Sequence, residues 1–167
     1  MVWRRVRPDP VGEGQESVWD YPRPPALVPS TRHVVIRLGG SLVAESRRAW
    51  RVLETSHPPG WYLPREDVVE GVLRPAAAPP SVCEWKGTAT YWDVVTADGV
   101  ASAAVWSYPS PTPGFAALAG AISAYPALLA CTVDGQRVRP QDGGFYGGWI
   151  TSDVVGPFKG GPGTWGW

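Results

Sequence analysis

Glycine and proline limit the fold of this chain more than any other feature of its sequence. They account for 20 and 19 of its 167 residues. Proline lacks the backbone N–H that a helix interior needs, and glycine has no side chain to restrict its backbone, so both disfavour long helices. The chain is nevertheless long enough to form one domain with a buried core. We therefore expect a mostly β domain of short strands joined by turns, with only one or two short helices.

The charge balance argues against two classes of partner. Lysine and arginine total 15 residues, and aspartate and glutamate also total 15. A net charge of zero gives no electrostatic reason to expect nucleic acid or an anionic membrane as partner. No apolar run reaches the ~20 residues of a membrane span, and no apolar segment follows the basic N-terminus as it does in a signal peptide. The sequence predicts a cytoplasmic protein.

Potential metal ligands are few. Cys83, Cys131, His33 and His57 are the only cysteines and histidines, and their spacing contains no CxxC or HxxxH pair. We therefore predict no metal site, and no other motif predicts a cofactor. The sequence leaves open whether the two cysteines form a disulfide.

Turn signals predict three β-hairpins. Each consists of two β-branched or aromatic runs with a glycine-containing dipeptide between them. The paired runs are 33–38 with 41–44 around Gly39-Gly40, 85–96 with 100–108 around Asp98-Gly99, and 131–133 with 136–138 around Asp134-Gly135.

The segments between these hairpins give weaker signals. Residues 47–54 fit either a short helix or an extended segment, and 61–63 are typical of a strand. Pro64 begins a predicted helical turn, and the Pro/Ala-rich residues 74–81 predict a loop. Apolar residues at helical spacing make 115–122 the best helix candidate.

We expect residues 1–15 to form a flexible N-terminal arm and residues 16–167 to form a single domain. Asp20 and Arg23 are expected to form a salt bridge that fixes the arm. From Gln141 onward the chain is rich in glycine and cannot form a core of its own. Its aromatic residues predict that this tail wraps over the domain.

Several motifs combine aromatic, charged and glycine residues. They are 17–24 (SVWDYPRP), 53–59 (LETSHPP), 85–91 (WKGTATY), 104–109 (AVWSYP), 145–151 (FYGGWIT) and 156–160 (GPFKG). Together they resemble a bacterial family called domain of unknown function 427, from about Glu16 to the C-terminal end of the chain.

This resemblance implies a β-tent-like fold, in which two small antiparallel sheets lean together, here with a glycine-rich C-terminal wrap. Many β-tent proteins bind structural zinc, but this chain lacks the CxxC pairs, so zinc is not expected. A nucleotidyltransferase-like label is sometimes attached to the family. Gly39-Gly40-Ser41 resembles the start of that motif, but no Asp-x-Asp or Asp-x-Glu pair follows to hold the metal ions.

Glu54, His57 and Lys86 are the candidate catalytic residues. His57 follows Glu54 by three residues and precedes Pro58-Pro59, which stiffens its position. It would act as a general base or acid that Glu54 orients, and Lys86 would hold an anionic group. The structural alternatives are a His57 that caps a turn and a Lys86 whose stem covers aromatic rings.

Ten residues are candidates for contact with a ligand, although most aromatics among them are the kind of residue found in a core more often than at a ligand. They are Trp19, Tyr21, Arg23, Tyr62, Trp85, Lys86, Tyr91, Trp106, Tyr146 and Trp149. The alternation of strand 85–96 predicts that Lys86 shares a face with Thr88 and Trp92, while Trp85 and Tyr91 face the other way.

The sequence supports three hypotheses about function. The first is a binding module whose aromatic pocket holds a polar or nucleotide-like small molecule, because ten tryptophans exceed what one small core needs. The second is a hydrolase or transferase that uses His57 as base and Lys86 as anion stabiliser. The third is a structural protein that forms a homodimer through exposed tryptophans.

Overall fold

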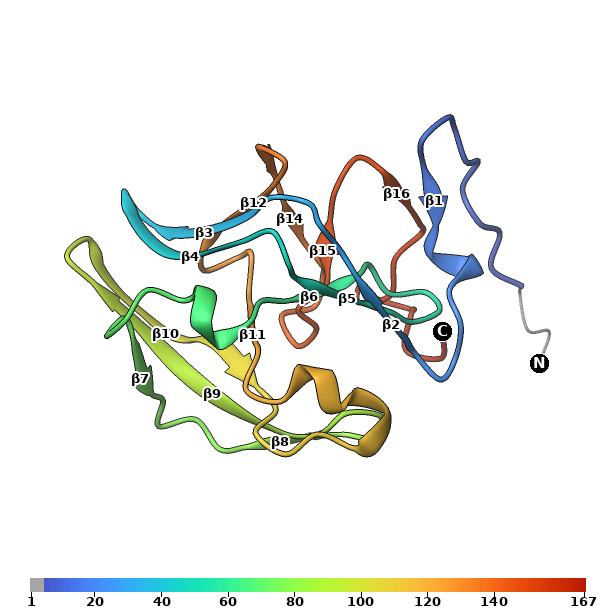
Figure 1. The fold of residues 1–167 in the computed structure, drawn as a ribbon. Coiled ribbons are helices and arrows are strands. Elements are labelled where there is room, and N and C mark those ends of the chain that lie inside the picture. Colours follow the sequence, from blue (N-terminus) through green and yellow to red (C-terminus); the bar gives the residue numbers. More distant parts are fainter. Residues whose placement is uncertain (1–4) are drawn as a thin grey trace.

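The computed structural model describes residues 5–167, and the fold is built of several small antiparallel sheets (Figure 1). One sheet has four strands in the order β13 (Gln136–Arg137), β12 (Ala130–Val133), β3 (Val34–Leu38) and β4 (Ser41–Ser46). A second has the order β11 (Ile122–Ala124), β10 (Gly99–Ser107), β9 (Gly87–Thr96) and β7 (Leu73–Pro75), and β8 (Ser81–Cys83) also pairs with β9. The prediction of a mostly β chain is confirmed.

Shorter strands complete the domain. A third sheet joins β2 (Ala26–Pro29), β5 (Trp50–Leu53) and β6 (Gly60–Tyr62). Two strand pairs involve the tail: β1 (Glu16–Ser17) with β16 (Val154–Val155), and β14 (Arg139–Pro140) with β15 (Trp149–Ile150). The helical segments within residues 5–167 are 3₁₀ turns: η1 (Val18–Asp20), η2 (Arg65–Asp67) and η3 (Pro113–Leu118).

All three predicted hairpins are present. β3 pairs with β4, β9 with β10, and β12 with β13, each in antiparallel register. The ambiguous segment 47–54 contains strand β5, and the predicted strand at 61–63 and helical turn after Pro64 correspond to β6 and η2.

The helix predicted for 115–122 is wrong. The chain forms the 3₁₀ segment η3, which is distorted at Phe115, and then turns at Gly120 with a φ of +73°. Ile122 begins β11 and pairs with Ser107 of β10, because its buried side chain belongs to the core between the sheets. The loop predicted for 74–81 is wrong at its two ends, where β7 and β8 pair with β9. β7 is an edge strand, which tolerates Pro75.

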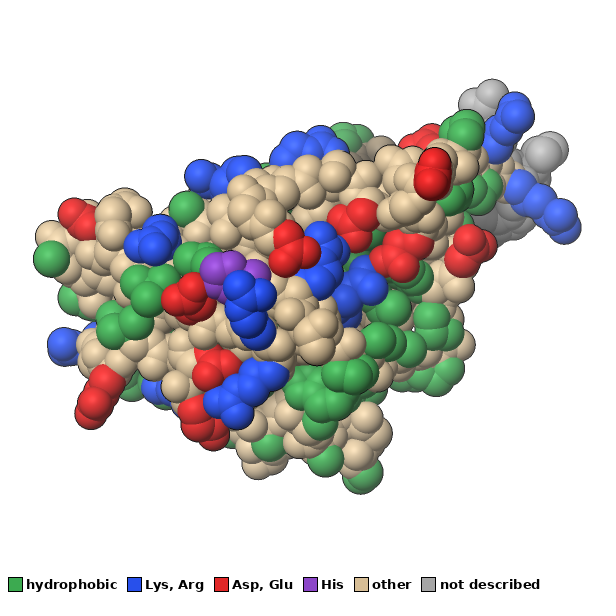
Figure 2. Space-filling model, turned by 45° about the horizontal axis from the view of Figure 1, so that its top comes forward, with side chains coloured by type: hydrophobic (Ala, Val, Ile, Leu, Met, Phe, Trp, Pro, Cys, Tyr) green, Lys and Arg blue, Asp and Glu red, His purple; other side chains and the backbone are tan. Residues whose placement is uncertain are grey.

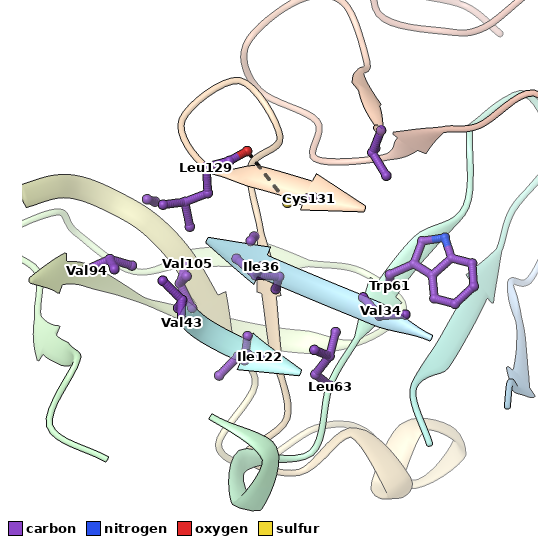
Figure 3. Packing of buried hydrophobic residues seen from close by; sticks show 14 of the residues in the cluster. Val34, Ile36, Val43, Trp61, Leu63, Val94, Val105, Ile122, Leu129 and Cys131 are labelled. Atoms are coloured by element: carbon purple, nitrogen blue, oxygen red, sulfur yellow. Dashed lines mark hydrogen bonds between the residues drawn. The ribbon is translucent and has the colours of Figure 1, made fainter. Parts of the chain in front are cut away.

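The main core lies between the β3–β4 sheet and the β9–β10 sheet, which Figure 1 shows as two facing layers. Figure 3 shows aliphatic side chains from both layers pointing into this space; among the fully buried ones are Val34, Ile36, Val43, Val94, Val105 and Ile122. Each such side chain stabilises the fold by roughly 1.5–3 kcal/mol relative to its exposed state.

The tail is docked onto this core, as the sequence predicted. Trp149 is fully buried, and its ring stacks on Trp61 at a centroid distance of 6.1 Å. Its Nε1 donates to the carbonyl oxygen of Ala124 over 2.9 Å, and its backbone N–H donates to that of Pro59. The tail therefore lies against β6 and the segment that precedes it.

The N-terminal segment also contacts the tail. Residues 1–4 of the predicted arm lie outside the described residues. The N–H of Asp9 donates to Gly156 O over 2.8 Å, and the side chain of Gln15 donates to Ser152 O over 2.9 Å. Within residues 5–167, no helix has the length and apolar character needed to cross a bilayer.

Candidate functional site

A cleft of about 320 Å³ lies where three parts of the chain meet. The segment between β5 and β6 contributes Glu54 and His57. The turn between β8 and β9 contributes Trp85 and Lys86. The tail contributes Gln141, Tyr146 and Lys159. The three candidate catalytic residues thus line the same cleft.

The backbone next to His57 is strained. Ser56 is fully buried and has a φ of +73°, a left-handed conformation that costs energy for a residue other than glycine. Two hydrogen bonds hold it there: its N–H donates to Val18 O over 3.0 Å, and its carbonyl oxygen accepts from Lys159 N over 2.9 Å. The buried packing around Ser56 therefore fixes the direction in which His57 leaves the chain.

His57 is held on three sides. Its Nδ1 lies 3.2 Å from Nε2 of Gln141, its Nε2 lies 3.7 Å from Oε2 of Glu54, and its ring meets Tyr146 edge-on at 4.9 Å. Burial is the main cause that lowers the pKa of His57, and together with the nearby positive charges of Lys159, Arg23 and Lys86 it brings the pKa to about 4. The imidazole is therefore uncharged at neutral pH.

Arg23 pairs with Glu54, and not with Asp20 as the sequence predicted. Arg23 Nε lies 3.5 Å from Glu54 Oε2, and its Nη2 donates to Thr55 O over 2.8 Å. The predicted salt bridge between Asp20 and Arg23 is therefore wrong. Arg23 instead fixes the segment that carries Glu54 and neutralises its charge.

The backbone at Gly87 decides where Lys86 lies. Strand β9 begins at Gly87, whose φ of +106° breaks the alternation of an extended chain. Lys86 therefore precedes the strand and lines the cleft together with Trp85 and Tyr91. The predicted separation of Lys86 from these aromatics onto opposite faces is wrong for this reason.

The wall of the cleft is aromatic. Trp106 and Tyr125 have ring centroids 4.5 Å apart, and Tyr91 shares a hydrogen bond of 2.7 Å with Ser81. Burial raises the pKa of the Tyr108 and Tyr125 hydroxyls, which therefore stay protonated at neutral pH. Such hydroxyls can donate a hydrogen bond to a ligand or accept one from it.

The ten candidate ligand contacts divide into two groups. Those that line the cleft are Trp85, Lys86, Tyr91, Trp106 and Tyr146. The other five are Trp19, Tyr21, Arg23, Tyr62 and Trp149, and none of them lines it.

Each residue of the second group has a packing role. Tyr62 lies behind the wall, where its hydroxyl accepts from Trp106 Nε1 over 3.2 Å. Trp19 packs against Trp167 and donates to Pro157 O, while Tyr21 is buried and donates to Glu16. Trp149 belongs to the core and Arg23 pairs with Glu54.

Among the cleft residues that sequence reasoning missed are Gln141, Lys159 and Tyr125. Only Lys159 carried a usable signal, because it and Lys86 are the only lysines of the chain. Gln141 donates to His57 Nδ1 and to Lys159 O and accepts from Gly148 N. It thereby joins the tail to the His57 segment.

Among residues 5–167, no group of three His, Cys, Asp or Glu side chains is placed to hold a metal ion. The two cysteines are free; Cys83 lies at the cleft and Cys131 lies in the core.

The family model for the domain of unknown function 427 (DUF427) matches residues 26–138. The chain belongs to the DUF427 family. No curated protein matches it. The matched DUF427 segment supplies Glu54, His57 and Lys86, whereas the tail residues Gln141 and Lys159 lie beyond it. The cleft is thus assembled from the DUF427 segment and the tail together.

Proposed function

We propose that this protein is a binding module, and that its cleft holds a polar or nucleotide-like small molecule with a flat ring. The observation that carries the proposal is the cleft itself. Its volume of about 320 Å³ falls within the range of small-molecule sites. Trp85, Tyr91 and Tyr146 supply flat apolar surface, and a few ionisable side chains lie among them.

The fixed geometry of the polar groups also favours binding. Glu54 is held by Arg23, His57 by Gln141, and the Lys159 backbone by Ser56 and Gln141. Groups that are already in place lose little conformational entropy when a ligand binds.

An enzyme of hydrolase or transferase type is the second candidate. The observation in its favour is that His57, Glu54 and Lys86 line one cleft. Two observations weaken it: His57 has a pKa of about 4, and its Nδ1 already accepts a hydrogen bond from Gln141. A general base with so low a pKa removes protons poorly at neutral pH, so we rank binding above catalysis.

A thermal-shift and tryptophan-fluorescence screen against a metabolite library tests the proposal. Each compound that responds is measured again with Trp85→Ala, which removes part of the wall. Trp165→Ala is the matched control, because Trp165 is 90% exposed and does not line the cleft. We expect at least a tenfold loss of affinity in Trp85→Ala and none in the control. A library without a single responding compound, or equal binding by both variants, would overturn the proposal.

A cytoplasmic location and a homodimer remain parts of the proposal. The free Cys83 and Cys131 fit a reducing compartment. Exposed Phe145 and Trp165 offer apolar surface to a second copy. Light scattering coupled to size-exclusion chromatography would decide the oligomeric state.

A further inference from the structure

The distribution of basic residues singles out the cleft. Lys86 and Lys159 are the only lysines among the 15 basic residues, and both line it. No arginine of residues 5–167 does so. A lysine ammonium is a compact point charge with three donors, whereas the arginine guanidinium is a broad planar fork. Two point charges from distant parts of the chain therefore meet at one small cavity.

Neither lysine has an acidic side chain as partner among residues 5–167. No aspartate or glutamate side chain lies within 4.0 Å of either ammonium group, so neither forms an ion pair with one. Lys86 Nζ lies 5.7 Å from the ring centroid of Tyr108, and Lys159 Nζ lies 5.7 Å from that of Tyr146. Lys159 Nζ also donates to Trp167 O over 3.1 Å.

On the outer face of the β3–β4 sheet, in contrast, basic side chains do form ion pairs with acidic ones. Figure 2, which brings that side forward, shows basic and acidic side chains interspersed. Arg32 pairs with Asp134 and Asp153, and Arg48 pairs with Asp67. The positive charges of Arg32 and Arg48 are therefore already paired.

The backbone fixes the two lysines. Lys159 donates its N–H to Ser56 O, and its carbonyl oxygen accepts from Gln141 Nε2 over 2.6 Å. Lys86 O accepts from Thr112 N over 3.1 Å, and the Thr112 hydroxyl donates to Trp85 O over 2.6 Å. The backbone at both lysines is thus held by hydrogen bonds to other parts of the fold.

The remaining ionisable groups leave the cleft positive. Glu54 is paired with Arg23, His57 is uncharged at neutral pH, and Glu84 is exposed. The charges of the lining residues Glu54, Glu84, Lys86 and Lys159 sum to zero, and the adjacent Arg23, which pairs with Glu54, adds one positive charge. The depression of the His57 pKa by Lys159, Arg23 and Lys86 reports the same positive field.

We infer that the ligand of the cleft is a small organic acid, whose carboxylate or phosphate group lies between Lys86 and Lys159 while its flat ring packs on the aromatic wall. This inference rests on the proposed function and names its ligand class. The ammonium groups bind carboxylate and phosphate alike by charge-assisted hydrogen bonds. The aromatic side chains select for a flat ring.

Matched pairs of compounds test the inference by isothermal titration calorimetry. Nicotinate and nicotinamide form the carboxylate pair, and adenosine monophosphate and adenosine form the phosphate pair. We expect at least one acid to bind at least tenfold more tightly than its neutral partner, with an affinity that falls as salt rises. The pair that shows the difference identifies the acidic group.

Variants then assign the effect to the lysines. Lys86→Met and Lys159→Met should each weaken binding of the acid at least tenfold and change binding of a neutral compound less than twofold. Lys86→Arg, which retains the charge, should lose less than Lys86→Met. Arg74→Met is the control, because Arg74 is exposed and lies outside the cleft.

The result that overturns the inference is distinct from failure of the proposed function. Acids that bind no better than their neutral partners, or not at all, overturn it. So does an acid that binds Lys86→Met and Lys159→Met as tightly as it binds wild type. Binding of a neutral compound that depends on Trp85 would still support a binding module in either case.

Discussion

Nε2 of Gln141 lies 3.2 Å from Nδ1 of His57. An amide nitrogen can only donate, so Nδ1 of His57 accepts, and the imidazole carries its proton on Nε2, which faces Glu54. Gln141 therefore favours the neutral tautomer of His57, and it links the tail to the segment between β5 and β6.

The neutral state of His57 makes stability depend on pH. Its pKa in the fold is about 4, below the ordinary 6.5. Between these values His57 binds a proton in the unfolded chain but not in the folded chain. The stability that the neutral His57 contributes is therefore complete above pH 6.5 and is lost as pH falls toward 4. The shift corresponds to about 3 kcal/mol. Urea unfolding from pH 4 to 7 should therefore show a shallower pH dependence for His57→Gln.

His33→Gln is the control for this experiment. His33 pairs with Glu45 on the surface and lies outside the cleft. This variant should keep the part of the pH dependence that His57 contributes. Equal slopes for wild type and His57→Gln would contradict an uncharged, buried His57.

Local signals explain which parts of the fold could be predicted. Gly39-Gly40 and Asp134-Gly135 lie at sequence-adjacent turns, so each hairpin is specified by a few neighbouring residues. The helix predicted for 115–122 failed because Ile122 pairs with Ser107, a long-range contact that outweighs local helical spacing.

The same distinction applies to the candidate site. Glu54 and His57 could be paired from the sequence because they are three residues apart. The contacts of Gln141 and Lys159 depend on where the tail docks, and no local pattern reports that. The direction in which the Lys86 side chain points depends on the positive φ of Gly87, and the alternation rule for strands does not take such a residue into account.

Gln141→Leu tests the link between the tail and the cleft. The leucine would leave the buried N–H of Gly148 without its acceptor and His57 Nδ1 without its donor. We expect the free energy of unfolding to fall by about 2–4 kcal/mol, since each unsatisfied buried group costs about 1–3 kcal/mol. Urea denaturation measures the change.

Gln136→Leu is the matched control for Gln141→Leu. Gln136 also accepts a backbone hydrogen bond, from Ser152 N, but it is exposed and water can replace it. Gln136→Leu should lower the free energy of unfolding by less than about 1 kcal/mol. A similar loss in both variants would show that Gln141 has no special role.

Gly147→Ala tests how closely the tail approaches the wall of the cleft. A Cβ at Gly147 would overlap the indole of Trp106. Because that indole is buried and hydrogen-bonded to Tyr62, it has little room to move. We expect a loss of about 1–3 kcal/mol in the free energy of unfolding, together with a change in tryptophan emission.

Gly114→Ala controls for the general effect of replacing glycine. A Cβ at Gly114 would meet open space, and its φ is not in the left-handed region. Its stability and emission should remain close to wild type. If Gly147→Ala behaved in the same way, the tail would not pack on Trp106 as described.

Lys159→Met should raise the pKa of His57. Burial is the first cause of the depressed pKa and remains in the variant, so the value should stay below 6.5. Lys159 is the next cause, and removal of its charge makes the imidazolium less unfavourable. NMR titration of the His57 ring protons measures the change, with Arg74→Met as control. An unchanged pKa would place the Lys159 ammonium away from His57.

A crystal structure with the tightest-binding acid of the matched pairs tests the central claim most directly. The account predicts that the acidic group lies ~3 Å from Nζ of both Lys86 and Lys159, as charge-assisted hydrogen bonds require, with the ring against Trp85, Tyr91 or Tyr146. A ligand outside the cleft, or one inside it whose acidic group points away from either lysine, would contradict the account.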